Sequence, residues 1–521
     1  MTQWPRFIKF CFDSGMSTLQ LQSSSNNDQI SPRQQADLLF AQQDWPQALA
    51  SYRAIPGFQT SSVLQLRIAE CCFNLGRFEE AYFSAMQAGE FHKSLLRATQ
   101  IQGRAACALG WVREWINLTE TAYSQSQPNP ELVLDFAQAQ LFGVGDALRA
   151  RSLAEPFVGN AVYGEQASRI VLMSYIYDRP HHLSARELAI QFHQYSAQYI
   201  APCAQALSYI NPPRQHNNSS VKRIGFVSPF FQASSTMFMA LKVLRQLASQ
   251  GHELIFFSRS PRKDWITVEL ESLPGQFIDC SSMSVVQLNS LFASSCLNEL
   301  YDMCGWLDTE VLKALTTRPA EKLYKWLGGQ VCSTGLDCFD GFVTDISHTP
   351  PSTHALYTEP LISFEPAHRM FTPSDKFPLP RKRIGAGSIA KLKRAESANI
   401  GVCCPPVYMS QAFLKALDQL MRSMPRGVRL LLIDIAYASP QSCDRVRKSL
   451  TLPESQLEFL APEDYLDTMY LMNELDLLVD TFPHSSGVRL LEAKHIKLPV
   501  YLFPFDRQLF CERQAIAYTV S

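Results

Sequence analysis

The stretch LDLLVDTFPHSSGVRLLEAKHIKLPVYLFPF, residues 475–505, contains the pattern of one complete structural unit. The apolar run 477–479 is too short for a helix and stops at Asp480, which predicts a buried parallel strand. A small-residue turn, 485–487, leads into a helical segment with apolar residues at core spacing, and a second strand is expected over 498–503. Strand, turn, helix and strand form a βαβ unit, so we expect an open α/β sheet.

The turn of this unit has the chemistry of an anion site. In open α/β sheets, ligands bind at the carboxyl ends of the strands, where Ser485, Ser486 and Gly487 are expected. Their backbone amides, at the start of a helix, suit a diphosphate. Glu492 is turned aside from the apolar face of that helix and could accept hydrogen bonds from a ribose. The stretch therefore predicts a nucleotide site.

The same stretch resembles the sugar-nucleotide site of the protein O-linked N-acetylglucosaminyltransferases. These form glycosyltransferase family 41, with the SPINDLY type and the bacterial adhesin N-glucosyltransferases. The family's strand end D-T-F-P matches at 480–483, and its acidic residue matches at Glu492. In a gapless match, the Thr run that holds the diphosphate in the family falls on 487–489. A gapped match instead sets 484–487 against His-Thr-Thr-Gly of the animal enzymes, and the sequence leaves both alignments open.

Other blocks extend the resemblance over about residues 222 to 521. KRIGFVSPFFQASSTMFM, 222–239, looks like the family's opening strand and the loop that follows it. The segment 302–345 is similar to the family's DLTGHT, RPAPVQ and WLGYPGTSGSDFIDYIVAD blocks. Thr-Pro-Pro at 349–351 and Tyr-Thr-Glu-Pro-Leu at 357–361 match S-P-P and Y-S-E-K-L. The order of the blocks is that of the family.

The chain departs from the family at the positions that the resemblance assigns to catalysis. The family's catalytic-loop histidine falls on Ser234, and a serine is no base near pH 7. The lysine that neutralises the leaving diphosphate falls on Tyr408, whose phenol carries no positive charge near neutral pH. The family's G-H-T block reads Gly-Trp-Leu at 305–307. Arg489 either supplies a compensating charge or is a solvated helix residue, and its position favours the second.

The base pocket of the family follows the strand before the helix that leads to D-T-F-P. The corresponding segment here begins at Ala461, and the backbone is expected to contact the base. Glu463 and Asp464 follow directly and fit the cap of the next helix equally well. Family members of this type use no metal, so the resemblance implies a UDP-sugar as donor and neither metal nor cofactor.

Composition limits the classes of function. The chain has 521 residues, 46% of them hydrophobic, and a net charge of −1, which gives no electrostatic footprint for nucleic acid or an anionic membrane. No apolar run is long enough to span a bilayer, and we expect no signal peptide. Fourteen scattered cysteines without a CxxC pair indicate reduced thiols, and eleven histidines show no metal-ligand spacing. These features favour a cytoplasmic, metal-free protein.

The first part of the chain has a different pattern. Residues 1–30 are predicted to be a disordered leader, and 31–205 a helical domain that packs on the first α/β half. A repeat of about 33 residues is typical of tetratricopeptide motifs, although an all-helical domain without a groove remains the alternative. The repeating positions are Ala36, Trp45 and Ala48, then Ala69, Phe78 and Ala81, with glycines at Gly76, Gly110 and Gly143.

Two strand-and-helix series follow the helical domain. Residues 206–221 are predicted to be a linker, 222–385 the first Rossmann-like half, 386–398 a second linker, and 399–521 the second half. Two such halves facing each other form the GT-B arrangement. The family continues with helices beyond the point where this sequence stops, so we expect a shortened C-terminal half.

The leading hypothesis is a protein glycosyltransferase that moves a hexose or N-acetylhexosamine from a UDP-sugar to protein side chains. The alternative is a family member without catalysis that acts as a binding or scaffold protein. A third possibility, an unrelated GT-B enzyme acting on lipid or polysaccharide, does not explain the helical repeats. The expected partners are a UDP-sugar and an acceptor protein or peptide, with no nucleic acid and no membrane insertion.

Overall fold

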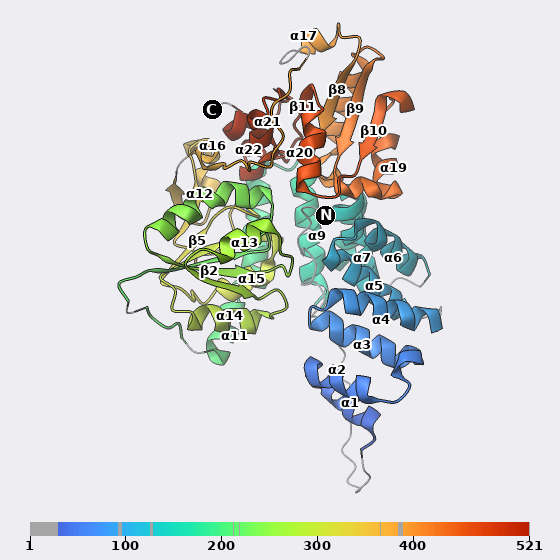
Figure 1. Ribbon diagram of the computed structural model, residues 1–521, viewed down its shortest axis with the longest axis vertical. Helices are drawn as coiled ribbons and strands as arrows, with labels where there is room; N and C mark the ends of the chain where they lie inside the picture. Colours follow the sequence, from blue (N-terminus) through green and yellow to red (C-terminus); the bar gives the residue numbers. More distant parts are fainter. Residues whose placement is uncertain are drawn as a thin grey trace.

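The computed structural model describes residues 30–519 apart from 92–95, 126–128, 212, 218, 365 and 384–388. The predicted disordered leader lies outside the described residues except for Ile30. Three parts follow one another along the chain (Figure 1): a helical part drawn in blue to teal, a sheet with its helices in green and yellow, and a smaller sheet in orange and red.

The helical part confirms the tetratricopeptide-like prediction. Neighbouring helices pack on one another along the chain, as α3 does on α4 and α5 on α6. The first helix begins with a capping box: the Ser31 hydroxyl accepts a hydrogen bond from the Gln34 amide, and the Gln34 side chain accepts one from the Ser31 amide. The helices are α1 (Pro32–Ala41), α2 (Trp45–Ala54), α3 (Ser62–Asn74), α4 (Phe78–Phe91), α5 (Leu96–Leu109), α6 (Val112–Ser124), α7 (Pro130–Gln138), α8 (Ala147–Ala154), α9 (Gly164–Tyr177), α10 (Ala185–Tyr195) and α11 (Cys203–Ile210).

The repeating glycines have two different roles. Gly76 and Gly110 follow α3 and α5 with φ of +73°, the left-handed conformation that commonly ends a helix. Gly143 instead lies inside a π-helical turn, η3 (Ala139–Val144), where a Cβ would come within 2.8 Å of the Ile116 side chain. The turn is made by Gly145, with φ of +82°. Close packing therefore explains the glycine at 143, whereas a left-handed helix end explains the other two.

The first α/β half contains a seven-stranded, all-parallel sheet. Its strand order is β3-β2-β1-β4-β5-β6-β7. The helices of this half are α12 (Ser235–Ser249), α13 (Trp265–Glu271), α14 (Val285–Ser294), α15 (Thr309–Leu315) and α16 (Ala367–Met370). The strands are β1 (Arg223–Ser228), β2 (Glu253–Ser258), β3 (Gly275–Asp279), β4 (Glu299–Asp302), β5 (Lys322–Lys325), β6 (Gly341–Thr344) and β7 (Leu361–Ser363).

The second half has five parallel strands in the order β10-β9-β8-β11-β12, the Rossmann pattern. The predicted strand over 498–503 is limited to two residues, because Pro499 lacks an N–H for the ladder and the neighbouring strand ends at Val479, the partner of Tyr501. The strands are β8 (Ala398–Val402), β9 (Val428–Ile433), β10 (Leu457–Leu460), β11 (Leu477–Val479) and β12 (Val500–Tyr501). The helices are α17 (Ile389–Leu392), α18 (Gln411–Arg422), α19 (Pro440–Lys448), α20 (Tyr465–Asn473), α21 (Arg489–His495) and α22 (Phe510–Thr519).

Both predicted linkers contain regular structure. Helix α11 continues to Ile210, so the start of the 206–221 segment is helical. The 386–398 segment contains α17 and the first residue of β8. No helix in the part of the chain that the structure describes is long and apolar enough to cross a bilayer.

The helical part packs on the first α/β half, where packing was predicted, and also on the second half. On the first half, the Phe192 ring lies 4.6 Å from that of Trp306. On the second half, the Ser442 hydroxyl donates to the Gly143 carbonyl at 3.0 Å. A Cβ on Gly145 would lie 2.6 Å from the Pro406 backbone. The helical part therefore joins the two halves.

The close approach at Gly145 gives a first prediction. Gly145→Ala places a side chain at positive φ and against backbone, so we expect a loss of about 2 kcal/mol in the free energy of unfolding. Urea denaturation followed by circular dichroism measures it. Gly57→Ala is the matched control, because Gly57 also has a positive φ of 75° but no heavy atom within 4 Å of its Cβ position. An equal loss in both variants would show that contact with the second half contributes nothing.

Candidate functional site

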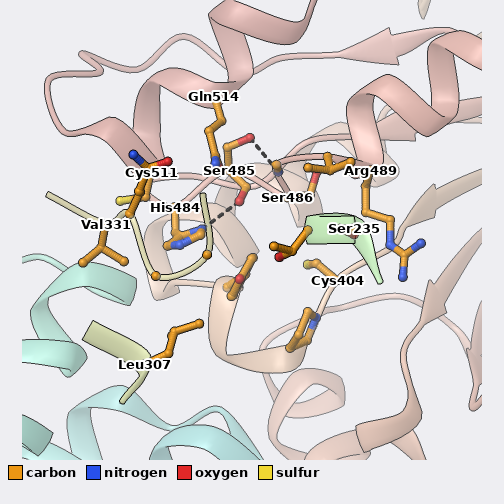
Figure 2. A pocket seen from close by; sticks show the side chains of 18 of the residues that line it. Ser235, Leu307, Val331, Cys404, His484, Ser485, Ser486, Arg489, Cys511 and Gln514 are labelled. Atoms are coloured by element: carbon orange, nitrogen blue, oxygen red, sulfur yellow. Dashed lines mark hydrogen bonds between the residues drawn. The ribbon is translucent and has the colours of Figure 1, made fainter. Parts of the chain in front are cut away.

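The candidate site is a cavity of about 230 Å³ between the two α/β halves. It lies where the carboxyl ends of both sheets face each other, the usual ligand position in such sheets. Residues after β1, β5, β8, β9 and β11 line it, and Phe142 and Tyr177 come from the helical part. Figure 2 shows the wall made by His484, Ser485, Ser486 and Cys511.

The predicted 485–487 turn lines the cavity, but its hydroxyl groups are already bonded. Asp480, at the end of β11, accepts hydrogen bonds from the Ser486 amide at 2.7 Å, the Ser486 hydroxyl at 2.6 Å and the Ser485 hydroxyl at 3.2 Å. The Gly487 amide donates to the Ser485 hydroxyl at 3.1 Å. Asp480 thus fixes the shape of the turn. The amides at 490–492 also bond within the protein, so at the start of this described helix the amides at 488 and 489 remain as anion donors.

The turn also connects the two halves. The Ser485 amide donates to the Cys511 carbonyl at 3.1 Å, and the Cys511 amide donates to the Val331 carbonyl at 3.3 Å. A Cβ on Gly487 would lie 2.9 Å from the Gln514 side chain. Helix α22 therefore forms one wall of the cavity, between the turn and the first half.

Arg489 is buried, so the prediction of a solvated helix residue is wrong. Its guanidinium lies 2.6 Å from the Glu492 carboxylate and 4.8 Å from the centre of the Tyr465 ring. Among the described residues that line the cavity, Arg489 is the single lysine or arginine. Its ion pair with Glu492 neutralises this positive charge.

Glu492 does not line the cavity, which differs from the predicted ribose contact. Its carboxylate is fully buried and bonded to Arg489 and to the Tyr465 hydroxyl. Burial raises the pKa of the Glu492 carboxyl, and the Ser235 hydroxyl, 3.5 Å away, opposes that rise. The adjacent guanidinium favours the charged form. The Glu492 carboxylate bonds to Tyr465 of α20 and does not line the cavity. Helical spacing in the sequence does not reveal this contact between two helices.

Tyr408, at the family's lysine position, is part of an aromatic stack. Its ring lies 4.1 Å from His484 and 5.4 Å from Tyr177. Burial raises the pKa of Tyr408 well above its ordinary value and lowers the pKa of His484 to about 4. The hydrogen bond between His484 Nδ1 and the Ser485 carbonyl opposes the fall. Both rings are therefore neutral near pH 7.

Ser234, at the family's histidine position, lines the cavity but has a structural role. It is the N-cap of α12: its hydroxyl accepts from the Met237 amide at 3.2 Å and donates to the Phe230 carbonyl at 2.9 Å. Trp306, in the segment that matches the family's G-H-T block, does not line the cavity and packs against the helical part. Neither position offers an acid or a base.

Ala461, at the predicted base pocket, is exposed and does not line this cavity. Asp464 is the N-cap of α20 and accepts a hydrogen bond from the Asp467 amide at 2.8 Å. Of the two roles that the sequence left open for Asp464, the helix cap is the one observed.

Most of the residues that line the cavity were not predicted from the sequence, among them Tyr177, Asp434 and Gln514. Tyr177 ends α9 in the helical part, and no local pattern connects it to a site 300 residues away. Asp434 follows β9 and belongs to the carboxyl edge of the second sheet, which a search for polar residues after strands would have found. Gln514 comes from α22. Among the described residues, no group of three or more His, Cys, Asp or Glu is arranged to hold a metal ion.

No protein-family model matches the sequence, and no curated protein matches it significantly. Among solved structures, a mutant O-GlcNAc transferase of Thermobaculum terrenum aligns with a TM-score of 0.73 at 19% identity. The alignment covers 89% of this chain and 86% of that one. The chain has the fold of an O-GlcNAc transferase. This confirms the resemblance to glycosyltransferase family 41 at the level of the fold, including the GT-B arrangement.

Two further structures align with smaller parts of this O-GlcNAc transferase fold. The TPR protein YrrB has a TM-score of 0.24 at 16% identity and covers 31% of this chain and 78% of its own. The S. aureus MnaA complex with UDP has a TM-score of 0.35 at 14% identity, with 55% and 80% covered. Scores of this size do not indicate a shared overall fold.

Proposed function

We propose that this chain binds a UDP-sugar in the central cavity and that glycosyl transfer to protein side chains is slow or absent. The observation that carries the proposal is the position of the cavity at the facing carboxyl edges of two Rossmann-like sheets. The O-GlcNAc transferase fold supports a sugar nucleotide as ligand, and a protein or peptide as the partner of the helical part.

The diphosphate is assigned to the start of α21. Val488 and Arg489 line the cavity, their backbone N–H groups have no partner among the described residues, and N–H groups at a helix N-terminus favour anions. Asp434 is the side chain that we assign to the ribose, because it lines the cavity at the end of β9 and a carboxylate accepts hydrogen bonds from hydroxyl groups. It takes the role that the sequence assigned to Glu492.

The same geometry supports the second candidate, a binding or scaffold protein. Ser234 caps a helix, Tyr408 is neutral and stacked, and Arg489 is paired with Glu492. Transfer requires groups that stabilise the charge developing on the leaving diphosphate, and none of these three side chains supplies an unpaired charge. A cytoplasmic location is consistent with the free thiols of the described cysteines.

Calorimetric titration of the full chain with UDP tests the proposal. We expect a saturable, one-to-one interaction that competes with a UDP-sugar and does not depend on added metal. Absence of binding at millimolar UDP would contradict the proposed ligand and leave a protein that keeps the fold alone.

Glu492→Gln distinguishes the two roles considered for that residue. If the carboxylate serves to neutralise Arg489, its amide isostere leaves the cavity wall one unit more positive. UDP should then bind about tenfold more tightly, which corresponds to about 1.4 kcal/mol. If the carboxylate holds the ribose, the same variant should bind UDP more weakly. The measurement is the calorimetric Kd, with Glu463→Gln, an exposed position, as the control.

A further inference from the structure

A turn of unusual conformation lines the cavity on the side opposite α21. Leu327, Gly328 and Gly329 follow β5 and have consecutive positive φ angles of 51°, 34° and 61°. A leucine in this region is uncommon and carries strain. A Cβ would lie 2.1 Å from the Met303 carbonyl oxygen at Gly328, and 2.0 Å from the Cys304 carbonyl oxygen at Gly329. Surrounding backbone therefore fixes the turn.

A buried lysine lies behind this 327–329 turn. Lys325 is 0% exposed, and its Nζ donates to the carbonyls of Asp302 at 2.9 Å, Leu327 at 2.7 Å and Gly328 at 2.6 Å. Three donated hydrogen bonds require the ammonium form, because a neutral amine has two N–H groups. The Asp302 carboxylate, 3.6 Å from Nζ, also favours the charge, whereas burial lowers the pKa of Lys325.

The N–H groups of the turn are not used. Among the described residues, the backbone N–H groups of Leu327, Gly328, Gly329 and Gln330 have no hydrogen-bond partner, and all four residues line the cavity. Lys325 Nζ donates to two carbonyls of the turn, on the side of the peptide groups opposite to their N–H groups. Successive unpaired N–H groups in a turn form a concave anion site, which a cation behind the peptide groups strengthens.

We propose that the 327–329 turn, with Lys325 behind it, binds the diphosphate oxygens of the donor from the first half. This inference rests on the proposed function and extends it: the diphosphate is held between the N–H groups of this turn in the first half and the Val488 and Arg489 amides in the second. Lys325 is paired with Asp302 and adds no net charge, but its donation to the carbonyls of Leu327 and Gly328 polarises the peptide groups whose N–H groups would bind the anion. Lys325 is a positioning residue, since its Nζ reaches the turn's carbonyls and not the cavity.

The first test compares anion binding in charge variants of the full chain. Lys325→Met should weaken binding of inorganic pyrophosphate and of UDP by about tenfold or more, and leave binding of uridine unchanged. Lys322→Met is the matched control, because Lys322 lies on the same strand with a side chain that is 57% exposed, and it should change none of the three affinities. Equal loss of uridine and pyrophosphate binding would indicate general damage to the cavity and contradict the proposal, as would no change.

The second test keeps the parent chain, in case Lys325→Met does not fold. In the protein labelled with ¹⁵N-glycine, the amide signals of Gly328 and Gly329 should shift on addition of pyrophosphate, while that of Gly57, on the surface of the helical part, should not. UDP binding without these shifts would overturn the inference and leave the proposed function intact. Shifts with pyrophosphate but no binding of UDP would support the anion site and overturn the proposed function. No response to either ligand would overturn both.

Discussion

Trp306→Ala should lower the free energy of unfolding by about 3–5 kcal/mol, the usual cost of deleting a large buried aromatic side chain. The ring is 1% exposed and lies 4.6 Å from Phe192 and 5.7 Å from Tyr195 of the helical part. Its Nε1 donates to the Ser333 carbonyl at 2.9 Å, which would lose its partner. Urea denaturation followed by circular dichroism measures the loss, and limited proteolysis reports whether the helical part separates first.

Trp265→Ala is the matched control, since it removes the same side chain from a half-buried position on the first half. The loss in the free energy of unfolding should be clearly smaller for this variant, because a half-buried ring covers fewer neighbouring side chains than a fully buried one. Equal losses in the two variants would show that the contact between Trp306 and the helical part contributes little to stability.

The second large effect concerns catalysis. The parent chain should transfer sugar slowly or not at all, and Ser234→His combined with Tyr408→Lys should raise the rate by about 10²–10³-fold. Both positions line the cavity, so an imidazole and an ammonium would be placed beside the donor. The release of UDP from UDP-N-acetylglucosamine, with and without an acceptor peptide, measures transfer and hydrolysis together.

Ser234→Ala with Tyr408→Phe removes the two hydroxyl groups without adding a base or a charge and serves as the control. It should leave the rate unchanged. Because Ser234 caps α12, its replacement costs about 1 kcal/mol of stability, so thermal melting of each variant must accompany the rates. Robust transfer by the parent, or no gain in the double variant although UDP binds, would contradict our assignment of these positions.

Strands and capped helices were predictable because their signals are local. The apolar runs at 253–258, 428–433, 457–460 and 477–479 are the observed strands β2, β9, β10 and β11. Asp464, which fits a helix cap in the sequence, is the N-cap of α20. The π-helical turn that contains Gly143 was not predictable, since the Ile116 side chain that requires a glycine there comes from another helix.

Much of the site depends on contacts between elements far apart in the sequence. The 485–487 turn lines the cavity, and its position was predictable because it follows a recognisable strand. The burial of Arg489 depends on Tyr465 of another helix, and the stacking of Tyr408 depends on Tyr177 of another domain. Lys325 gave no signal, because a lysine within a short strand is more often exposed, and its carbonyl partners become visible only in the folded turn.

The end of α9 has a consequence for the opening of the molecule. Three consecutive residues there contact three elements of the second half: Tyr177 stacks on His484, Asp178 accepts from the Gln411 amide at 3.3 Å, and Arg179 pairs with Glu512 at 2.8 Å. The helical part also contacts the first half through Trp306. The helical part therefore connects the two α/β halves, and a hinge motion that separates the halves must break one of these two sets of contacts.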